Sequence, residues 1–437
     1  MKKFLICFLI IFSLFIVGCR KEKENEIRYL NFKPEIATVY QEIANKYEEK
    51  TGVKVIVETA ASGSYESTLQ ARMGTSMAPT IFQINGPVGY ASWKDYCLDL
   101  KETKLYNNLI DKDNAIKSGE GIYGIGYVVE GYGIIYNKEI TDKYFSSSWK
   151  SVAINSIEEI KSFEMFKKVV EDMQLHKDKL GIEGVFASTS LKTGEDWRWQ
   201  THLFNAPLSY EISEGNITDY SKLEFKYLDK YKQVFDLYLD NSSKEKGKLG
   251  TVTVSDSMAE FALGKCAMVQ NGNWAASQVL GVSGNVVKSE NIKFMPIFSG
   301  HTSDETQGLY IGTENFICIN AKASKEKQKL AIDFLEWLYL SDEGKEIVIK
   351  KLKFITPFEG YDYSESITDP LALEVIKWMN NKDVKNVGWN FTIIPSLTFK
   401  EDFGSNLLKY AQGKTTWEEV TTNLKNKWKS EWDLMNK

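Results

Sequence analysis

Tryptophans beside glycine, asparagine and acidic residues are the groups in this sequence best suited to hold a ligand. Residues 195–199 read Glu-Asp-Trp-Arg-Trp, while Trp274 and Trp389 stand next to asparagine and glycine. A large planar ring suits the flat C–H face of a sugar, and carboxylate, amide and guanidinium groups can satisfy its hydroxyls. Each tryptophan could also fill a core or a seam between lobes. The residues therefore indicate a sugar-type ligand and leave a structural role open.

Catalytic motifs are weak by comparison. Ser-x-x-Lys occurs at Ser147, Ser243 and Ser324, as chance allows in a Lys-rich chain, without the Ser-Asp-Asn partner of a serine acyl-enzyme. The sequence has no Gly-x-Ser-x-Gly and no phosphate loop, and its three histidines are too far apart for an HxxxH metal motif. We therefore expect a non-enzymatic protein without metal or cofactor. A pair among the 59 acidic residues that cleaves a glycosidic bond remains the rival interpretation.

Length and composition describe a large globular protein. The 437 residues, 43% apolar and 26% charged, predict two to four domains. The formal net charge is −5, and the sequence has only four arginines, so a nucleic-acid partner is excluded. Cys97, Cys266 and Cys318 are widely spaced and odd in number, which favours free buried thiols, although one pair could form a disulfide.

The first twenty residues have the features of a secretory signal. Lys2 and Lys3 precede the apolar run 4–17, which is shorter than the about 20 residues of a membrane-spanning helix. The Ile-Val-Gly-Cys that ends at Cys19 resembles the bacterial lipoprotein cleavage box, in which the cysteine is lipidated. We expect a signal peptide at residues 1–18, a lipidated Cys19 opening a charged tether at 19–26, and an extracytoplasmic protein anchored to the cell membrane. The alternative is an uncleaved anchor.

Strand-like and helical segments alternate along the rest of the chain. Strands are predicted at residues 27–32, 53–57, 80–84, 267–270, 292–296 and 315–320, and helices at 39–47, 163–173, 228–239, 257–263 and 329–340. This pattern predicts an open α/β sheet with parallel strands, whose ligand loops follow the carboxyl ends of the strands. Lys33 and Asn85 stand in such loops. The Trp417–Trp432 stripe predicts a helix packed on the body.

Six segments, in order, resemble the extracellular carbohydrate-binding subunits of bacterial ABC importers, the family that includes maltose-binding protein. They are residues 29–32, 51–55, 78–82, 127–138, 261–274 and 319–338. The resemblance implies an α/β, two-lobed periplasmic-binding-protein-like fold with a ligand cleft between lobes joined by several chain crossings. It places the N-terminal lobe at 27–131 and 307–356, and the C-terminal lobe at 132–306 and 357–437.

The resemblance also implies a set of ligand-binding residues. Glu130 matches the glutamate that bonds sugar hydroxyls, and Trp274 matches the tryptophan that stacks on the sugar. The family's further acid, aromatic and loop positions fall on Asp196, Trp197, Trp199, Trp389, Asn85, Tyr65, Lys33 and Arg198. Asn85 stands where maltose-type members carry an acid, and Asn273 replaces a common proline. These departures leave the identity of the sugar open.

The implied function is capture of a sugar, more in keeping with a di- or oligosaccharide than a monosaccharide. The implied partners are an ABC permease and its ATPase, with the membrane reached through Cys19, and we expect a monomer. A secreted glycoside-active enzyme and a same-fold binding protein for a polyamine or peptide are the alternatives.

Overall fold

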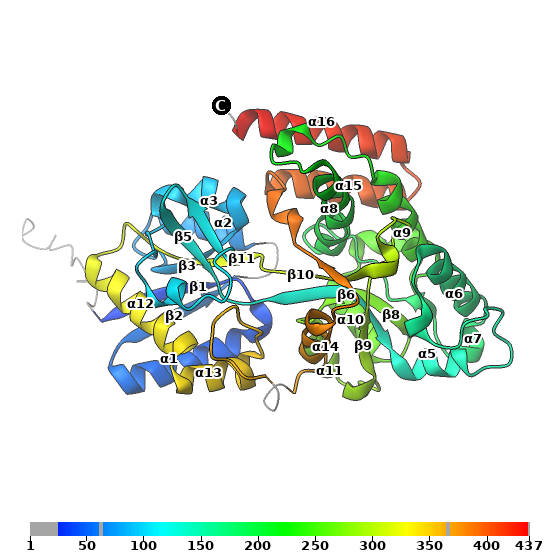
Figure 1. Cartoon of the computed structure of the whole chain (residues 1–437), viewed down its shortest axis with the longest axis horizontal. Coiled ribbons are helices and arrows are strands. Elements are labelled where there is room, and N and C mark those ends of the chain that lie inside the picture. Colours follow the sequence, from blue (N-terminus) through cyan, green and yellow to red (C-terminus); the bar gives the residue numbers. More distant parts are fainter. Residues whose placement is uncertain (1–24, 61–63, 364–367, 436–437) are drawn as a thin grey trace, which may run out of the picture.

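The computed structural model describes residues 25–60, 64–363 and 368–435, and shows two mixed α/β lobes, each built on its own sheet (Figure 1). The expected signal peptide and Cys19 lie outside the described residues. The first sheet has the strand order β2-β1-β3-β11-β5-β4, and the second β12-β10-β6-β8-β7 with β9 also paired to β6. The α/β, two-lobed expectation is confirmed.

The first sheet begins with the parallel strands that the sequence predicts and adds antiparallel ones. Its strands are β1 (Glu26–Asn31), β2 (Lys54–Thr59), β3 (Ile81–Asn85), β4 (Ala115–Ser118), β5 (Gly121–Gly126) and β11 (Asn315–Ile319). Strand β1 pairs in parallel with β2 and β3, whereas β11 runs antiparallel to β3 and β5. The carboxyl ends of β1 and β3 therefore point to the same edge, where Lys33 and Asn85 follow.

Helices cover both faces of this sheet because its strands are apolar on both sides. Its helices are α1 (Ala37–Thr51), α2 (Tyr65–Met73), α3 (Gly86–Trp93), α4 (Lys104–Asn107), α12 (Lys325–Leu340) and α13 (Asp342–Ile347). Along β1, Tyr29 packs with α1 and α12, while its neighbour Leu30 packs with α2. This alternation is the two-residue side-chain period of a strand.

The second sheet is centred on the long strand β6, which extends from the middle of the molecule (Figure 1). Its strands are β6 (Glu130–Asn137), β7 (Gly184–Phe186), β8 (Cys266–Gly272), β9 (Ile292–Met295), β10 (Gln307–Gly312) and β12 (Lys385–Val387). All eight residues of β6 are buried. A strand that is covered on both sides reads as a continuous apolar run rather than as an alternation.

Most helices of the molecule surround this second sheet. They are α5 (Lys138–Phe145), α6 (Phe163–Leu175), α7 (Lys177–Leu180), α8 (Asn205–Gly215), α9 (Leu228–Asp240), α10 (Val254–Ala262), α11 (Ala275–Leu280), α14 (Pro370–Asn380), α15 (Leu397–Ala411) and α16 (Trp417–Met435). Val420, Leu424 and Trp428 of α16 are buried against the lobe, so the predicted role of the C-terminal stripe is confirmed.

Short helices make up the connections that shape the site. Those near the cleft are η1 (Pro34–Ile36), η4 (Arg198–Leu203, a π-helix), η9 (Val348–Leu352, also π) and η10 (Asn390–Ile393). The others are η2 (Lys94–Tyr96), η3 (Ile157–Glu159), η5 (Tyr220–Lys222), η6 (Lys246–Thr251), η7 (Ser289–Asn291) and η8 (Asp304–Thr306).

The chain passes between the sheets from β5 to β6, from β10 to β11, and again after η9, where Val129 and Ile355 form a β-bridge. Residues 307–312 were expected in the first lobe, and this expectation was wrong. They form β10, which pairs with β6 and β12 of the second sheet. The apolar run Leu309–Ile311 suits a strand of either sheet, and pairing with β6 decides between them.

The three body cysteines, Cys97, Cys266 and Cys318, are free and buried, as expected. Across residues 25–60, 64–363 and 368–435, no helix is long and apolar enough to cross a bilayer. Within the same ranges, no cluster of His, Cys, Asp and Glu could hold a metal ion.

Candidate functional site

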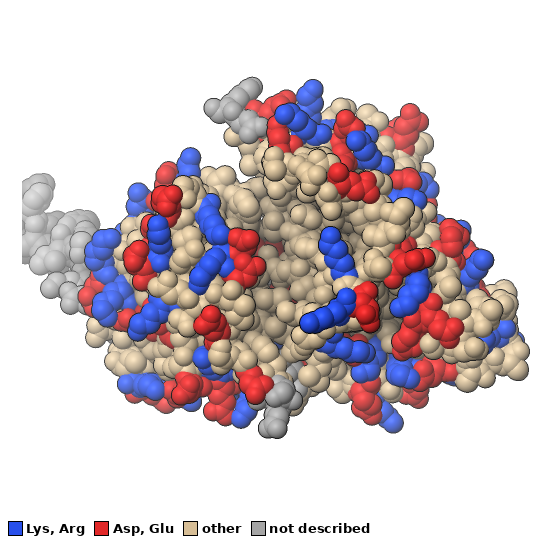
Figure 2. Space-filling view, in the orientation of Figure 1, with Lys and Arg blue, Asp and Glu red and all other residues tan. Residues whose placement is uncertain are grey.

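A cavity of about 220 Å³ lies between the two lobes, and residues from both line it. Glu35 and Val39 come from the first lobe, Asn273 and Trp274 from the second, and Glu130 from the start of the crossing strand β6. The space-filling view shows the molecular surface hollowed between the lobes (Figure 2). Two of the expected ligand residues, Glu130 and Trp274, therefore face the same space.

Glu130, which lines this cavity, belongs to a buried ion pair with Lys33. The Lys33 ammonium lies 2.6 Å from Glu130 Oε1 and 3.8 Å from Glu35 Oε1, and its Nζ is 5.9 Å from the centroid of the Phe354 ring. Burial alone would lower the pKa of Lys33, but the two carboxylates outweigh it and raise the pKa. Lys33 is thus held as a cation that donates a hydrogen bond to Glu130. An ammonium donor and a carboxylate acceptor are also the two kinds of partner that a ligand hydroxyl requires.

Trp274, which lines the cavity, belongs to an aromatic cluster of the second lobe. The ring of Trp274 lies 6.1 Å from that of Trp197 and 6.4 Å from that of Trp389, the latter at 87°. His202 stacks on Tyr132 with centroids 4.4 Å apart and lies 5.5 Å from Trp274. Three tryptophans from separate parts of the sequence therefore converge on one surface of the second lobe.

Two glycines at strand ends let these rings lie against the sheet. A Cβ at Gly272, the last residue of β8, would lie 2.1 Å from the Trp274 ring. A Cβ at Gly312, the last residue of β10, would lie 2.7 Å from Cγ of Trp389. A side chain at either place would occupy the position of an indole ring, so glycine is required by close approach.

The interior of the aromatic cluster is uncharged. Burial, together with the charges of Lys400 and Arg198, lowers the pKa of His202 from 6.5 to about 3. A neutral imidazole is therefore expected at neutral pH. The indole Nε1 of Trp389 and Nδ1 of His202 are buried and have no hydrogen-bond partner among the described residues. Such groups are costly to leave unpaired, and a bound ligand could satisfy them.

The lobes also meet at the end of β3, whose last residue is Asn85. The side-chain amide of Asn85 donates a 2.8 Å hydrogen bond to Glu314 Oε1, in the connection between β10 and β11. Next to it, a Cβ at Gly86 would lie 2.7 Å from Cβ of Thr392 in η10, so the two lobes touch at this point. Gly86 has φ of +59°, which also favours glycine.

Four expected ligand residues point away from the cleft. Trp199 is 1% exposed, and its ring packs on Phe235 and Tyr238. Arg198 is also 1% exposed, and its guanidinium donates hydrogen bonds to the Gln270 carbonyl at 3.0 Å and to Ser190 Oγ at 2.6 Å. Tyr65 lies in the first lobe, where its hydroxyl accepts a 2.7 Å hydrogen bond from the backbone N–H of Gln83. Asp196 is 4% exposed and faces Gly404 of α15. These side chains shape the lobes and do not line the cavity.

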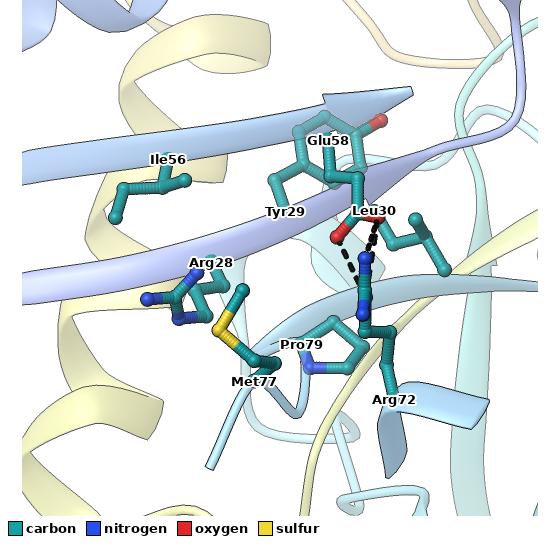
Figure 3. A pocket seen from close by; sticks show the side chains of 8 residues that line it. All are labelled: Arg28, Tyr29, Leu30, Ile56, Glu58, Arg72, Met77 and Pro79. Carbon is teal, nitrogen blue, oxygen red and sulfur yellow. Dashed lines mark hydrogen bonds and ion pairs between the residues drawn. The ribbon is translucent and has the colours of Figure 1, made fainter. Parts of the chain in front are cut away.

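A second, small pocket lies in the first lobe, lined by Arg28, Met77 and the paired side chains of Arg72 and Glu58 (Figure 3). Arg72 Nη2 lies 2.7 Å from Glu58 Oε1. The cavity of about 10 Å³ has room for about one water molecule. It is too small for a sugar ring.

Sequence reasoning missed several residues at the cleft. Glu35 stands two residues after Lys33 in the same loop, which is a signal that could have been used. Phe354 has no such signal, because only contacts between segments distant in the sequence bring it to the cavity. His202 was considered only as a metal ligand, and its neighbours are aromatic rings.

A family model described as bacterial extracellular solute-binding protein matches residues 42–375. The chain belongs to this family. The match spans both lobes and places the solute-binding protein outside the cytoplasm, as expected. No curated protein sequence matches the chain.

Solved structures share the fold of this solute-binding protein over nearly its whole length. A chitin oligosaccharide binding protein has a TM-score of 0.73 at 16% identity, covering 93% of this chain and 99% of its own. The solute-binding protein RafE in complex with raffinose has a TM-score of 0.69 at 17% identity, covering 94% and 100%. A Bacillus licheniformis sugar transporter in complex with stachyose has a TM-score of 0.67 at 13% identity, covering 93% and 100%. At these identities the likeness establishes the fold.

Proposed function

We propose that this solute-binding protein captures a di- or oligosaccharide in the cleft between its lobes and delivers it to an ABC permease driven by an ATPase. The observation that carries the proposal is the cavity lined by both Trp274 and Glu130, whose carboxylate is paired with Lys33. An indole face covers the C–H face of a sugar ring, and the charged pair offers both a donor and an acceptor to its hydroxyls.

The size of the aromatic surface supports a ligand of more than one ring. Trp197 and Trp389 extend the surface beyond Trp274, with ring centroids about one sugar ring apart. The structural neighbours described above are a binder of chitin oligosaccharide and complexes with raffinose and stachyose, all of which are oligosaccharides. Both observations favour an oligosaccharide over a monosaccharide.

Ligand capture is proposed to close the cleft by a hinge in the chain crossings between the sheets. A sugar that touches Glu130 at a crossing and Trp274 in the second lobe has its full set of contacts only when the lobes are together. It therefore stabilises the closed form by its differential affinity for that form.

The lipid anchor at Cys19 is a separate proposal, supported by the cleavage box and the apolar run before it. A Cys19→Ser variant expressed in a bacterium should move from the membrane fraction to the soluble extracytoplasmic fraction, because it has no thiol to lipidate. Membrane retention equal to that of the wild type would contradict the proposal. Cys97→Ser, at a buried body cysteine, is the matched control.

The sugar-binding proposal is tested by thermal unfolding of the protein against a panel of sugars. A ligand present at about 100 times its dissociation constant adds about 2.7 kcal/mol of stability. We expect one or more oligosaccharides to raise the unfolding midpoint of the wild type, and Trp274→Ala to abolish the shift. Trp432→Ala, a half-buried tryptophan of α16 outside the cavity, should keep it. Stabilisation by a polyamine or a peptide alone would contradict the proposal.

The same panel of sugars distinguishes a binding protein from a glycoside-active enzyme, the alternative function. A binding protein leaves its ligand intact, so incubation of the stabilising sugar with the protein should release no reducing ends. Release that depends on Glu35, Glu130 or Asp369, the carboxylates of the cavity, would establish the enzyme instead.

A further inference from the structure

Asn273 stands where strands β6 and β8 of the second sheet separate. The antiparallel register pairs Tyr132 with Gly272, so the next pair along the ladder is Gly131 with Asn273. The backbone N–H of Asn273 donates a 3.0 Å hydrogen bond to the Gly131 carbonyl, as such a pair requires. The return bond differs, because the N–H of Gly131 donates at 3.0 Å to the side-chain oxygen Oδ1 of Asn273. A side-chain carbonyl therefore completes the pair.

The side chain takes this place because the backbone of Asn273 has already turned away from the sheet. Trp274 follows with φ of −60° and ψ of −17°, which is a helical conformation, and α11 begins at Ala275. The backbone carbonyl of Asn273 accepts a 3.3 Å hydrogen bond from the N–H of Ala276, in the first turn of that helix. Asn273 thus ends the ladder and starts the turn that carries Trp274.

These hydrogen bonds connect the two cavity residues on which sugar binding is proposed to depend. Gly131 directly follows Glu130, and Asn273 directly precedes Trp274. The two bonds between Gly131 and Asn273 therefore hold the backbone next to the carboxylate against the backbone next to the indole. Glu130 and Trp274 both line the cavity, and Asn273 lines it as well.

The NH2 group of the Asn273 side chain is left for a ligand. A backbone N–H can only donate, so the side-chain atom that meets Gly131 is the amide oxygen, and the amide nitrogen is the other end of the group. Among the residues that the structure describes, this nitrogen has no hydrogen-bond partner, and it is not one of the unpaired polar atoms that are sealed from solvent. Asn273 is 8% exposed and lines the cavity, so its NH2 group is a free donor at the ligand site.

We propose that Asn273 determines the affinity of the cleft for its sugar in two ways. Its side-chain oxygen fixes the positions of Glu130 and Trp274 relative to each other, and its NH2 group donates a hydrogen bond to an oxygen of the sugar ring that stacks on Trp274. The inference rests on the proposed sugar-binding function. Hydroxyl and ring oxygens lie around the edge of a sugar ring and accept hydrogen bonds, so an NH2 group beside the indole has acceptors to bind.

Two substitutions separate the two roles. Asn273→Asp has nearly the same shape and keeps an oxygen for the Gly131 N–H, but it has no NH2 group. Asn273→Ala has neither group. The matched control is Asn137→Asp at the other end of β6. There a buried asparagine side chain also accepts a hydrogen bond from a backbone N–H, that of Glu139 at 3.1 Å, and it lies outside the cavity.

Titration calorimetry measures the ligand-binding role, with raffinose, stachyose, xylotriose and the N-acetylglucosamine trimer as probes. For each probe that the wild type binds, we expect Asn273→Asp to weaken binding at least about tenfold, because a carboxylate replaces the donor. Asn273→Ala should weaken it at least about thirtyfold, because the backbones of Glu130 and Trp274 are also released from each other. Asn137→Asp should stay within about twofold of the wild type. Asn273→Asp that binds every probe as Asn137→Asp does would overturn the ligand-binding role.

Amide hydrogen exchange resolved to Gly131 measures the positioning role and needs no ligand. We expect the Gly131 N–H to be protected in the wild type and in Asn273→Asp, and to exchange at least about tenfold faster in Asn273→Ala. A Gly131 N–H that is unprotected in the wild type, or equally protected in Asn273→Ala, would overturn the positioning role. Asn273→Leu, which has a similar volume and no polar group, replaces Asn273→Ala if that variant fails to fold.

Failure of the proposed function is recognised separately from failure of this inference. The wild type would then bind none of the sugars, before any variant is compared, and the ligand-binding role of Asn273 would fall with it. The exchange of the Gly131 N–H would still decide whether Asn273 holds Glu130 and Trp274 together.

Discussion

At the residue scale, the carboxyl of Asp196 is buried and forms no ion pair within 4.0 Å with any cation in the part of the chain that the structure describes. A Cβ at Gly404 would lie 1.8 Å from Asp196 Oδ2, so the carboxyl fills the place of a side chain on α15. Burial raises its pKa from 3.8 to about 6, against the effect of backbone amides that hydrogen-bond to it. The folded state therefore holds a proton that the unfolded state has lost between about pH 4 and pH 6.

This difference fixes the sign of a pH effect. Because the folded form binds the extra proton, the free energy of unfolding contributed by Asp196 falls as pH rises from about 4 to about 6. Asp196→Asn keeps an acceptor for the backbone amides and has no charge to bury. We expect it to raise the stability at pH 7 by about 2 kcal/mol and to match the wild type near pH 4.

Urea unfolding at pH 4 to 7 measures this prediction. The control is Asp402→Asn, at an exposed aspartate of α15, the helix against which Asp196 packs. It should change the free energy of unfolding by less than about 0.5 kcal/mol at each pH. An Asp196→Asn protein that is less stable than the wild type at every pH would show that the carboxylate is stabilising, contrary to the expectation.

At the element scale, the π-helix η4 sorts neighbouring side chains between cleft and core. Trp197 precedes it and faces Trp274, whereas Trp199, two residues later, lies in the core of the second lobe. Arg198 between them reaches the carbonyl of Gln270 and the Ser190 hydroxyl, and burial lowers its pKa to about 10. Such π segments are frequent at functional sites. Here Arg198 anchors the segment that presents Trp197.

Arg198→Met should therefore destabilise the protein by about 3 kcal/mol, because it leaves buried carbonyl and hydroxyl groups without their donor. Arg198→Lys should recover only part of this loss, since an ammonium cannot reproduce the planar set of donors. Guanidinium unfolding measures both variants.

Arg28→Met, which removes a partly exposed pair with Glu26, is the control and should cost less than about 1 kcal/mol. Arg198→Met within about 1 kcal/mol of the wild type would contradict the anchoring role.

The elements also show which parts of the fold could be predicted from the sequence. The strands at 27–32, 53–57 and 80–84 were predictable because short apolar runs between helical segments form parallel strands. The lobe to which β10 belongs could not be predicted, because β10 pairs with β6, and this pairing joins segments that are distant in the sequence. Likewise, the sequence Trp197-Arg198-Trp199 does not show which of its side chains faces Trp274 and which lies in the core. The conformation of η4 decides this.

At the scale of the whole molecule, the two lobes meet around the cavity on more than one side. Gly86 approaches Thr392 at one side, and the Lys33–Glu130 pair joins the lobes at another. The two lobes, each built on its own sheet (Figure 1), are therefore in contact at both of these places. A sugar held between them would be largely shielded from water, which strengthens its polar contacts.

The measurement that tests this account most directly is a crystal structure of the protein with the oligosaccharide that stabilises it most. The account predicts a sugar ring on the face of Trp274, hydroxyls within hydrogen-bond distance of Glu130 and Lys33, and lobes closed around the ligand. An empty cavity with the sugar bound elsewhere, or a sugar that contacts only one lobe, would contradict it.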